Sequence, residues 1–263
     1  MSSRETAFNG DAAVMFAEHA DTVRGYVRYE LVKQNLGSLV AAEELEIVDI
    51  GGGSAIDAIW LAELGHHVTV AEPAADQLAK AEARLAQASP GARRRVRLRR
   101  STSEDLLDAG ETGKYDLVVS HGVAMYLPDP TRFIDSLMLL ARPRGHVSLL
   151  EKNYYGAYNT LVREGKYAEA LSLAETHHFT NHMGRKVWTF LPEELENDLR
   201  IAGAGENYMR WSGVRINRDT DYRKIADVSE SELRTIVEDE YEVGQRLDTR
   251  GLGQMLHFIA QKA

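Results

Sequence analysis

Apolar positions along the chain follow two spacings, and the alternation of these spacings predicts the secondary structure. Residues 8–42 carry apolar side chains three and four positions apart, which is typical of a helix. Short β-branched or alternating runs then recur, with helical stretches between them. These runs, each predicted to be a strand, occupy residues 46–50, 67–71, 96–99, 116–120 and 146–150. Strands that alternate with helices form a parallel sheet with helices on both faces.

The pattern changes after Lys152. Residues 153–190 contain no strand candidate and are rich in tyrosine and histidine, so we expect a helical insert after the fifth strand that forms a lid. The earlier alternation then resumes, with a helix at 192–202, a strand at 208–216, a helix at 229–242 and a final strand at 255–260. We therefore predict a single α/β domain over residues 1–263 with an N-terminal helical segment.

Composition places the chain among ordinary folded proteins. Hydrophobic residues make up 44% of the 263 residues and charged residues 27%. The absence of cysteine excludes disulfides, thiolate metal sites and a cysteine nucleophile. Residues 1–6 contain no apolar signal core, and no window reaches the roughly 20 apolar residues that a membrane span needs. We therefore expect a cytoplasmic protein without a membrane partner.

The balance of charge disfavours nucleic acid as the main partner. The chain has 40 acidic residues against 31 lysines and arginines, which gives a formal net charge of −9. A run of arginines between residues 93 and 100 is the exception. It falls on the predicted third strand, and charged edge strands prevent edge-to-edge pairing of sheets. We therefore interpret the run as a solvated sheet edge.

A glycine-rich turn follows the first predicted strand and marks the candidate site. Gly51, Gly52 and Gly53 come directly after this strand, where glycines let the backbone approach a ligand closely. Glu72 ends the second strand, 21 residues after Gly51, where a carboxylate can accept hydrogen bonds from both hydroxyls of a ribose. The turn and the strand-end acid together predict a nucleoside cofactor.

The residues around the turn also indicate which kind of nucleoside cofactor fits. A dinucleotide fingerprint would require glycine at position 56, where this chain has Ile56. Asp49 precedes the glycines and would repel a pyrophosphate, whereas it can bind the ammonium group of an amino-acid moiety. These features favour a methyl donor that carries an amino acid and no phosphate.

Residues 46 to about 152 resemble the class I S-adenosylmethionine-dependent methyltransferases at the level of these motifs. The resemblance implies a Rossmann-like, seven-stranded, mostly parallel sheet with an antiparallel last strand. It also implies S-adenosylmethionine as cofactor and S-adenosylhomocysteine as product. Carried onto this chain, the cofactor-binding residues are Asp49, Gly51, Gly52 and Gly53 for the methionine part, Glu72 for the ribose, Ser103 and Glu104 for the adenine, and His121 beside the methyl group.

A narrower set of segments is similar to the bacterial tRNA uridine-5-oxyacetic acid methyltransferases. These segments are residues 24–28, 121–130, 213–215 and 252–257, together with Asn153. The similarity implies that Arg28 contacts the cofactor and that Arg215 meets a carboxylate of the substrate. Tyr126 replaces a usual tryptophan, and Gln254 with Met255 replaces Arg-Tyr. These departures leave the substrate open.

Two enzyme functions and one non-catalytic function therefore remain. The first is transfer of a methyl group to an oxygen or nitrogen of a small metabolite, which the net charge favours. The second is methyl esterification of a modified wobble uridine in tRNA. A scaffold that binds the cofactor without transfer is the third. The sequence leaves the oligomeric state open.

The mechanism predicted for either enzyme is a direct in-line displacement, in which the protein mainly positions the acceptor and excludes water. A general base is needed only for an acceptor that arrives protonated, and His121 and Tyr126 are the candidates. Alternatively, His121 is an ordinary histidine at a strand end.

The insert supplies further candidates. Asn153 and Tyr154 are predicted to bind the substrate, and the aromatic residues of the insert form either its own core or the wall of the acceptor pocket. His177, His178 and His182 could suggest a metal site. No acidic residue at a helical spacing completes a ligand set, so no metal is predicted.

Overall fold

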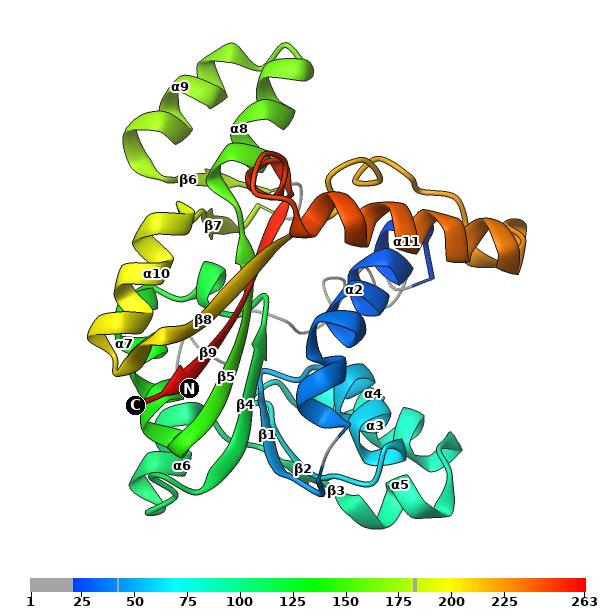
Figure 1. The fold of residues 1–263 in the computed structure, drawn as a ribbon, viewed down its shortest axis with the longest axis vertical. Coiled ribbons are helices and arrows are strands. Elements are labelled where there is room, and N and C mark those ends of the chain that lie inside the picture. The colour runs from blue at the N-terminus through cyan, green and yellow to red at the C-terminus, as the bar shows by residue number, and fades with distance from the viewer. Residues whose placement is uncertain (1–20, 42, 182–183) are drawn as a thin grey trace.

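The computed structural model describes residues 21–41, 43–181 and 184–263, the side chains of 206 and 207 aside. A seven-stranded sheet forms its centre (Figure 1). The strands are β1 (Glu46–Ile50), β2 (His67–Ala71), β3 (Val96–Arg99), β4 (Tyr115–His121), β5 (Ala141–Lys152), β8 (Ala204–Val214) and β9 (Met255–Lys262). Their order is β3-β2-β1-β4-β5-β9-β8, and all neighbours are parallel except β9, which runs antiparallel to β5 and β8. The predicted sheet is confirmed.

The register of the parallel strands brings their carboxyl ends to one edge of the sheet. Asp49 near the end of β1 lies beside Val70 of β2 on one side and Val119 of β4 on the other. His121, the last residue of β4, lies beside Leu150 of β5. The side chains at these strand ends therefore share one region, where open α/β sheets bind their ligands.

Helices cover both faces of the sheet, as expected. In Figure 1, α2, α3, α4 and α11 lie on one side and α6, α7 and α10 on the other. The helices of the main body are α2 (Val23–Val40), α3 (Ile56–Glu63), α4 (Ala75–Gln87), α5 (Pro90–Arg95), α6 (Ser103–Asp108), α7 (Pro130–Leu140), α10 (Pro192–Ile201) and α11 (Glu230–Gln245), with the short turns η1 (Ala124–Tyr126), η2 (Ile225–Asp227) and η3 (Arg250–Leu252). No helix in the described ranges is both long and apolar enough to cross a membrane.

The N-terminal helix α2 packs against α11 and runs from it along the side of the sheet that α3 and α4 also cover (Figure 1). It begins after Thr22, whose side chain accepts a hydrogen bond from the Gly25 amide (3.2 Å) and caps the helix. Its buried side chains recur at helical spacing and include Val27 and Leu31. Residues 8–20 and 42 of the predicted N-terminal helical segment lie outside the described residues.

β3 is an edge strand of the sheet, as predicted from the arginine run. Several of these arginines contact the protein itself. Arg95 lies 3.4 Å from a carboxylate oxygen of Glu44, Arg99 pairs with Glu111, and Arg93 donates to the backbone oxygen of Ala86 (3.2 Å). The ion pairs of Arg95 and Arg99 neutralise part of the positive charge that would otherwise attract a polyanion.

The insert after β5 differs from the prediction, which placed no strand in residues 153–190. Two helices, α8 (Tyr154–Arg163) and α9 (Tyr167–Thr176), are followed by a two-stranded hairpin of β6 (His178–Thr180) and β7 (Lys186–Trp188). Strands of three residues are too short to show a period of two, and these two pair only with each other. α8 and α9 share a small apolar cluster of their own, separate from the main core.

Candidate active site

A cavity of about 1350 Å³ opens at the carboxyl ends of the parallel strands. Its walls come from the ends of β1, β2, β4 and β5, from α2 and α3, and from the segment after β8. The predicted cofactor residues line it together: Arg28, Asp49, Gly51, Gly52, Gly53, Glu72, Ser103, Glu104 and His121. Tyr126 and Arg215 line it as well, so predictions from separate parts of the sequence meet in one place.

The glycine turn forms a cradle that has no room for side chains. Gly51 has φ +69°, and a Cβ atom there would lie 2.6 Å from Cγ2 of Val123. A Cβ atom on Gly52 would lie 2.4 Å from Oδ2 of Asp49. Glycine is therefore required at both positions by backbone conformation or by space.

Glu72 connects this turn to the following helix. Its side chain is buried, and its two oxygens accept hydrogen bonds from the backbone N–H groups of Gly53 (3.1 Å) and Ala74 (2.8 Å). Burial raises the pKa of Glu72, while these two bonds oppose the shift. Each carboxylate oxygen keeps a lone pair, so the side chain is fixed and can still accept hydrogen bonds from a ligand.

Asp49 and Asp57 place negative charge below the cradle. Burial, followed by repulsion from Asp57, raises the pKa of Asp49 well above its usual range, and a cationic ligand would lower it again. Burial also opposes ionisation of Asp57, but Arg28 (3.6 Å) and His121 outweigh it and bring the pKa of Asp57 to about 2. The buried Oδ1 of Asp57 has no hydrogen-bond partner in the described ranges.

The segment after β3 meets the cavity at the start of α6. Thr102 caps this helix, because its hydroxyl accepts from the Asp105 amide (3.2 Å). The hydroxyl of Ser103 lies 2.8 Å from that of Ser136 on α7 and is therefore used within the protein. Of the two predicted adenine contacts, Glu104 keeps the more available side chain.

Both ring nitrogens of His121 are engaged. Nδ1 lies 3.0 Å from Oδ2 of Asp57, and Nε2 lies 2.9 Å from the hydroxyl of Ser148. Burial lowers the pKa of His121 despite the carboxylate of Asp57, which favours the neutral form of the ring. The prediction of His121 as a general base is therefore corrected, because neither nitrogen is available to accept a proton from an acceptor group.

Tyr126 belongs to the turn η1, which one buried carboxylate holds in place. Oε1 of Glu151 accepts hydrogen bonds from the amides of Val123 (3.2 Å) and Ala124 (2.9 Å), and Oε2 accepts from the amide of Met125 (3.0 Å). Burial, together with the charge of Glu151, raises the pKa of Tyr126 to about 12. Tyr126 therefore keeps its proton and is suited to donate a hydrogen bond, not to act as a base.

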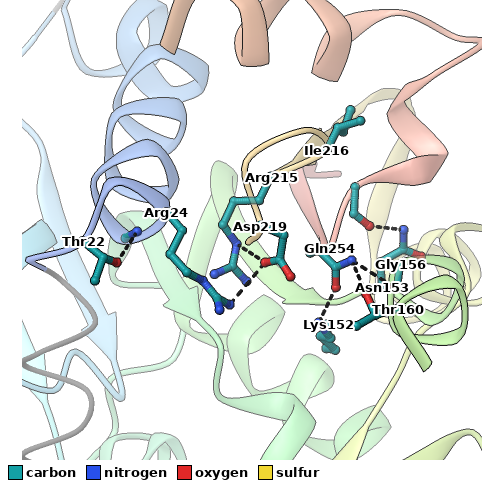
Figure 2. A network of polar contacts seen from close by, with 12 residues as sticks. Thr22, Arg24, Lys152, Asn153, Gly156, Thr160, Arg215, Ile216, Asp219 and Gln254 are labelled. Atoms are coloured by element: carbon teal, nitrogen blue, oxygen red, sulfur yellow. Dashed lines mark hydrogen bonds and ion pairs between the residues drawn. The ribbon is translucent and has the colours of Figure 1, made fainter. Parts of the chain in front are cut away.

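Positive charge gathers where α2, the end of β5 and the segment after β8 line the cavity (Figure 2). Arg24 of α2 and Arg215, which follows β8, both contact one carboxylate oxygen of Asp219, at 3.2 and 3.4 Å. Arg215 is buried and has φ +59°, a backbone conformation that is rare for a side chain of its size. Its placement here is specified by the surrounding fold.

Lys152 adds a third cation at the end of β5. Its ammonium donates to Oε1 of Gln254 (2.7 Å), and Nε2 of Gln254 is anchored on α8 by the backbone oxygen of Gly156 (3.0 Å) and the hydroxyl of Thr160 (2.8 Å) (Figure 2). Burial lowers the pKa of Lys152 to about 8, with Arg215 as a further cause and Asp219 in opposition. An anion bound here would raise the pKa of Lys152 again.

The structure does not bring Asn153 and Tyr154 to the cavity, and these two substrate-binding predictions are corrected. Asn153 is fully buried, and its amide donates to the backbone oxygens of Gly251 and Gly253 while its oxygen accepts from the Tyr155 amide. Tyr154 stacks on the ring of Tyr158, at 6.0 Å between centroids, within the insert. Both residues stabilise the start of α8.

Several residues of the site were not predicted from the sequence. Asp57, Lys152 and Lys80 line the cavity, and the buried ammonium of Lys80 has no hydrogen-bond partner in the ranges described. Lys152 could have been found, because a charged residue that ends a buried apolar strand is a signal of a site. Asp57 lies within a helical pattern, and nothing in that pattern separates it from a solvated charge. Among the described residues, no group of three or more potential ligands could hold a metal ion.

Comparisons with known proteins agree with this arrangement. Residues 48–147 match a family model described as a methyltransferase domain. The chain is 26% identical to the tRNA 5-carboxymethoxyuridine methyltransferase of Escherichia coli, over 92% of this chain and 90% of the relative. The fold is similar to that of magnesium protoporphyrin IX methyltransferase from Synechocystis with bound S-adenosylhomocysteine, with a TM-score of 0.64 at 13% identity over 99% and 98% of the two chains. It is also similar to 1,6-didemethyltoxoflavin-N1-methyltransferase from Burkholderia thailandensis, with a TM-score of 0.54 at 17% identity over 96% and 88%.

The residues present fit S-adenosylmethionine. Gly51 and Gly52 line the cavity with backbone alone, which lets a ligand approach closely, and the carboxylates of Asp49 and Asp57 supply negative charge for a cofactor with ammonium and sulfonium groups. Glu72 offers fixed acceptors for ribose hydroxyls. With the matching domain and the strand order, these features show that the chain is a class I S-adenosylmethionine-dependent methyltransferase.

Proposed function

We propose that this enzyme transfers the methyl group of S-adenosylmethionine to a carboxylate oxygen of its acceptor, which forms a methyl ester. The observation that carries the proposal is the excess of positive charge where Arg24, Lys152 and Arg215 line the cavity, since the two arginines share the single carboxylate of Asp219. A carboxylate is the nucleophile that this charge attracts and orients. An amine that carries a proton would be repelled.

The state of the two candidate bases supports the same conclusion. His121 has both nitrogens engaged, and Tyr126 keeps its proton because its pKa is raised to about 12. An ionised carboxylate needs no base. Its oxygen attacks the methyl carbon, the O–CH₃ bond forms as the S–CH₃ bond breaks, and no proton is transferred.

The chain's own residues then bind the cofactor, orient the acceptor and exclude water. When bound, the cofactor supplies an activated methyl group. We propose that Asp49 and Arg28 hold the ammonium and carboxylate of its methionine part and that Glu72 holds the ribose. Arg215 and Lys152 orient the acceptor carboxylate in line with the methyl group. Tyr126 lines the same cavity and can donate a hydrogen bond to the acceptor.

The acceptor we propose first is a carboxylated uridine in tRNA. The similarity to the tRNA 5-carboxymethoxyuridine methyltransferase extends over 90% of that relative's length. Its nucleoside carries a carboxylate, which is the group that the cations of this cavity would attract. A small metabolite with a carboxylate is the second candidate, because the net charge of −9 opposes tRNA binding.

We also propose that residues 1–263 act as one domain in the cytoplasm, with the insert at 153–190 as a lid.

Mass spectrometry of nucleosides from bulk tRNA of a deletion strain separates the two acceptors. We expect the methyl ester of the carboxylated wobble uridine to be lost and the free acid to accumulate. Complementation with the intact gene should restore the ester, whereas the Arg215→Met variant should not. An unchanged nucleoside profile would remove tRNA as the acceptor and leave the small carboxylic acid.

A further inference from the structure

A continuous chain of buried hydrogen bonds runs across β9, β5 and β4 and connects two residues in the interior of α2, Asn35 and Arg28. It starts at Asn35 on α2, whose amide nitrogen lies 3.0 Å from Nδ1 of His257 on β9. Nε2 of His257 lies 2.8 Å from the hydroxyl of Ser148 on β5, which lies 2.9 Å from Nε2 of His121. Nδ1 of His121 reaches Asp57 at 3.0 Å, and Asp57 faces Arg28, back on α2.

The direction of each hydrogen bond is fixed from the far end. Gln245 donates its amide to Oδ1 of Asn35 (2.8 Å), so the NH₂ group of Asn35 faces His257. Nδ1 of His257 must therefore accept, and its Nε2–H donates to the oxygen of Ser148. The hydroxyl hydrogen of Ser148 is then left for Nε2 of His121. His121 consequently carries its only proton on Nδ1 and donates it to Asp57.

Every link of this chain holds one hydrogen, so an additional proton has no place in it. A proton on Nε2 of His121 would face the hydroxyl hydrogen of Ser148, which could turn away only by losing its acceptor. The charged and titratable groups near His121 are Asp57 on α3, Arg28 on α2 and His257 on β9. Arg210 on β8 also acts on His257, and Asp49 on β1 acts on Asp57.

We propose that His121 is a positioning residue, held in its Nδ1–H tautomer by His257, Ser148 and Asn35, and that it keeps the carboxylate of Asp57 ionised and oriented toward the cofactor site. A neutral ring is needed at this place, because a second positive charge beside Arg28 would oppose a sulfonium cofactor. This chain of hydrogen bonds, called the relay below, also connects Asp57 to α2 at two residues, Arg28 and Asn35. This inference rests on the proposed cofactor site for its function, but not for its geometry.

The tautomers can be measured directly on the intact protein by nitrogen-15 NMR of its histidine rings. Signals of His121 and His257 are assigned by their loss in His121→Asn and His257→Gln. We expect His121 to be protonated on Nδ1 alone and His257 on Nε2 alone, both unchanged between pH 5.5 and 8. Protonation of His121 on Nε2, or on both nitrogens anywhere between pH 5.5 and 8, would overturn the proposal.

A pair of serine variants tests the consequence for the cofactor. Ser148→Ala breaks the relay, whereas Ser212→Ala removes only a side branch, in which the amide of Asn35 also donates to the Ser212 hydroxyl (2.8 Å). Calorimetric titration with S-adenosylhomocysteine and S-adenosylmethionine should give pH-independent affinity between pH 5.5 and 7.5 for the wild type and Ser212→Ala. In Ser148→Ala, Nε2 of His121 loses its hydrogen-bond partner and can take a proton, so we expect affinity for the sulfonium cofactor to fall about tenfold as the pH is lowered. Equal pH profiles in all three proteins would contradict the proposal.

Failure of the relay can be told apart from failure of the cofactor site. If the tautomers are as stated but Asp49→Asn and Glu72→Gln bind the cofactor normally, the proposed cofactor site is wrong. If those variants lose affinity but His121 has the other tautomer, the relay is wrong.

Discussion

Single residues give the two ends of the cavity opposite charge. Asp49, Asp57 and Glu72 lie at the glycine cradle, whereas Arg215 and Lys152 lie at the other end. A cationic cofactor and an anionic acceptor are therefore each attracted to a different end. His121 and Tyr126 also line the cavity, but both nitrogens of His121 are hydrogen-bonded within the protein and Tyr126 keeps its proton.

Replacement of either carboxylate at the cradle should weaken cofactor binding. Asp49→Asn and Glu72→Gln keep the shape of the side chain and remove its charge. A hydrogen bond to a charged group is worth about 1.5–3 kcal/mol. We therefore expect the dissociation constant measured by calorimetry to rise by roughly 10- to 100-fold. Glu82→Gln, an exposed residue of α4, is the control and should bind as the wild type does. Wild-type affinity in both cradle variants would contradict the assignment.

Lys152 predicts how acceptor recognition depends on pH. Its pKa is lowered to about 8 by burial and Arg215, so the ammonium form that attracts a carboxylate is lost as the pH rises through 8. The kcat/KM for the acceptor should be flat between pH 6 and 7.5 and fall above pH 8. Lys152→Met should be lower and flat over the same range, whereas Lys33→Met, on α2 outside the cavity, should keep the wild-type profile. A profile for Lys152→Met that still falls at pH 8 would assign the titration to another group.

The residues that sequence reasoning placed correctly have a local signal, and those it misplaced depend on tertiary contacts. Glu72 follows from its position at a strand end after a glycine turn. Asn153 also ends a strand, but its amide turns toward the backbone of residues 251 and 253, about 100 positions away in sequence. No local pattern announces that contact. The engagement of both nitrogens of His121 is hidden for the same reason.

At the level of elements, η1 depends on a single side chain. Glu151 reaches from β5 and accepts three backbone N–H groups of residues 123–125, which have no other way to be satisfied in a buried turn. η1 in turn carries Tyr126 into the cavity. β5 therefore shapes the acceptor side of the site twice, through Glu151 and through Lys152.

Removal of this carboxylate should loosen the turn. Glu151→Ala leaves three buried donors unpaired, and we expect a loss of about 2–4 kcal/mol in the free energy of unfolding, measured by urea denaturation. Glu151→Gln keeps one acceptor oxygen and should lose less. Because η1 lies on the acceptor side, KM for the acceptor should rise more than the dissociation constant of the cofactor. Equal effects on the binding of both ligands would contradict the assignment of η1 to the acceptor side of the site.

Elements with a clear period were predictable, and short ones were not. The five strands from β1 to β5 follow from β-branched runs that end in turns, and α7 and α10 begin at a proline in the first turn. The hairpin of β6 and β7 has only three residues in each strand. Its stability comes from contacts such as Lys186 over the ring of Trp188 (3.9 Å), which no period reveals.

The whole molecule combines an acidic surface with cations inside its cavity. The net charge is −9, and part of the arginine run on β3 is paired within the protein. If tRNA is the acceptor, recognition therefore relies on the internal cations more than on phosphate contacts. We expect KM for tRNA to depend weakly on salt, with a slope of about 1 to 3 in a plot of log KM against log salt concentration. A slope near 6 or above would show an extended basic interface instead.

The nature of the transferred bond tests the central claim most directly. The purified enzyme is incubated with S-adenosylmethionine that carries a deuterated methyl group and with tRNA from the deletion strain, and the nucleosides are examined by mass spectrometry before and after mild alkali. A methyl ester releases its label as methanol in alkali, whereas a methyl group on nitrogen or on a hydroxyl oxygen is retained. We predict a labelled carboxylated uridine whose label alkali removes. A labelled product that keeps its methyl group in alkali would contradict transfer to a carboxylate.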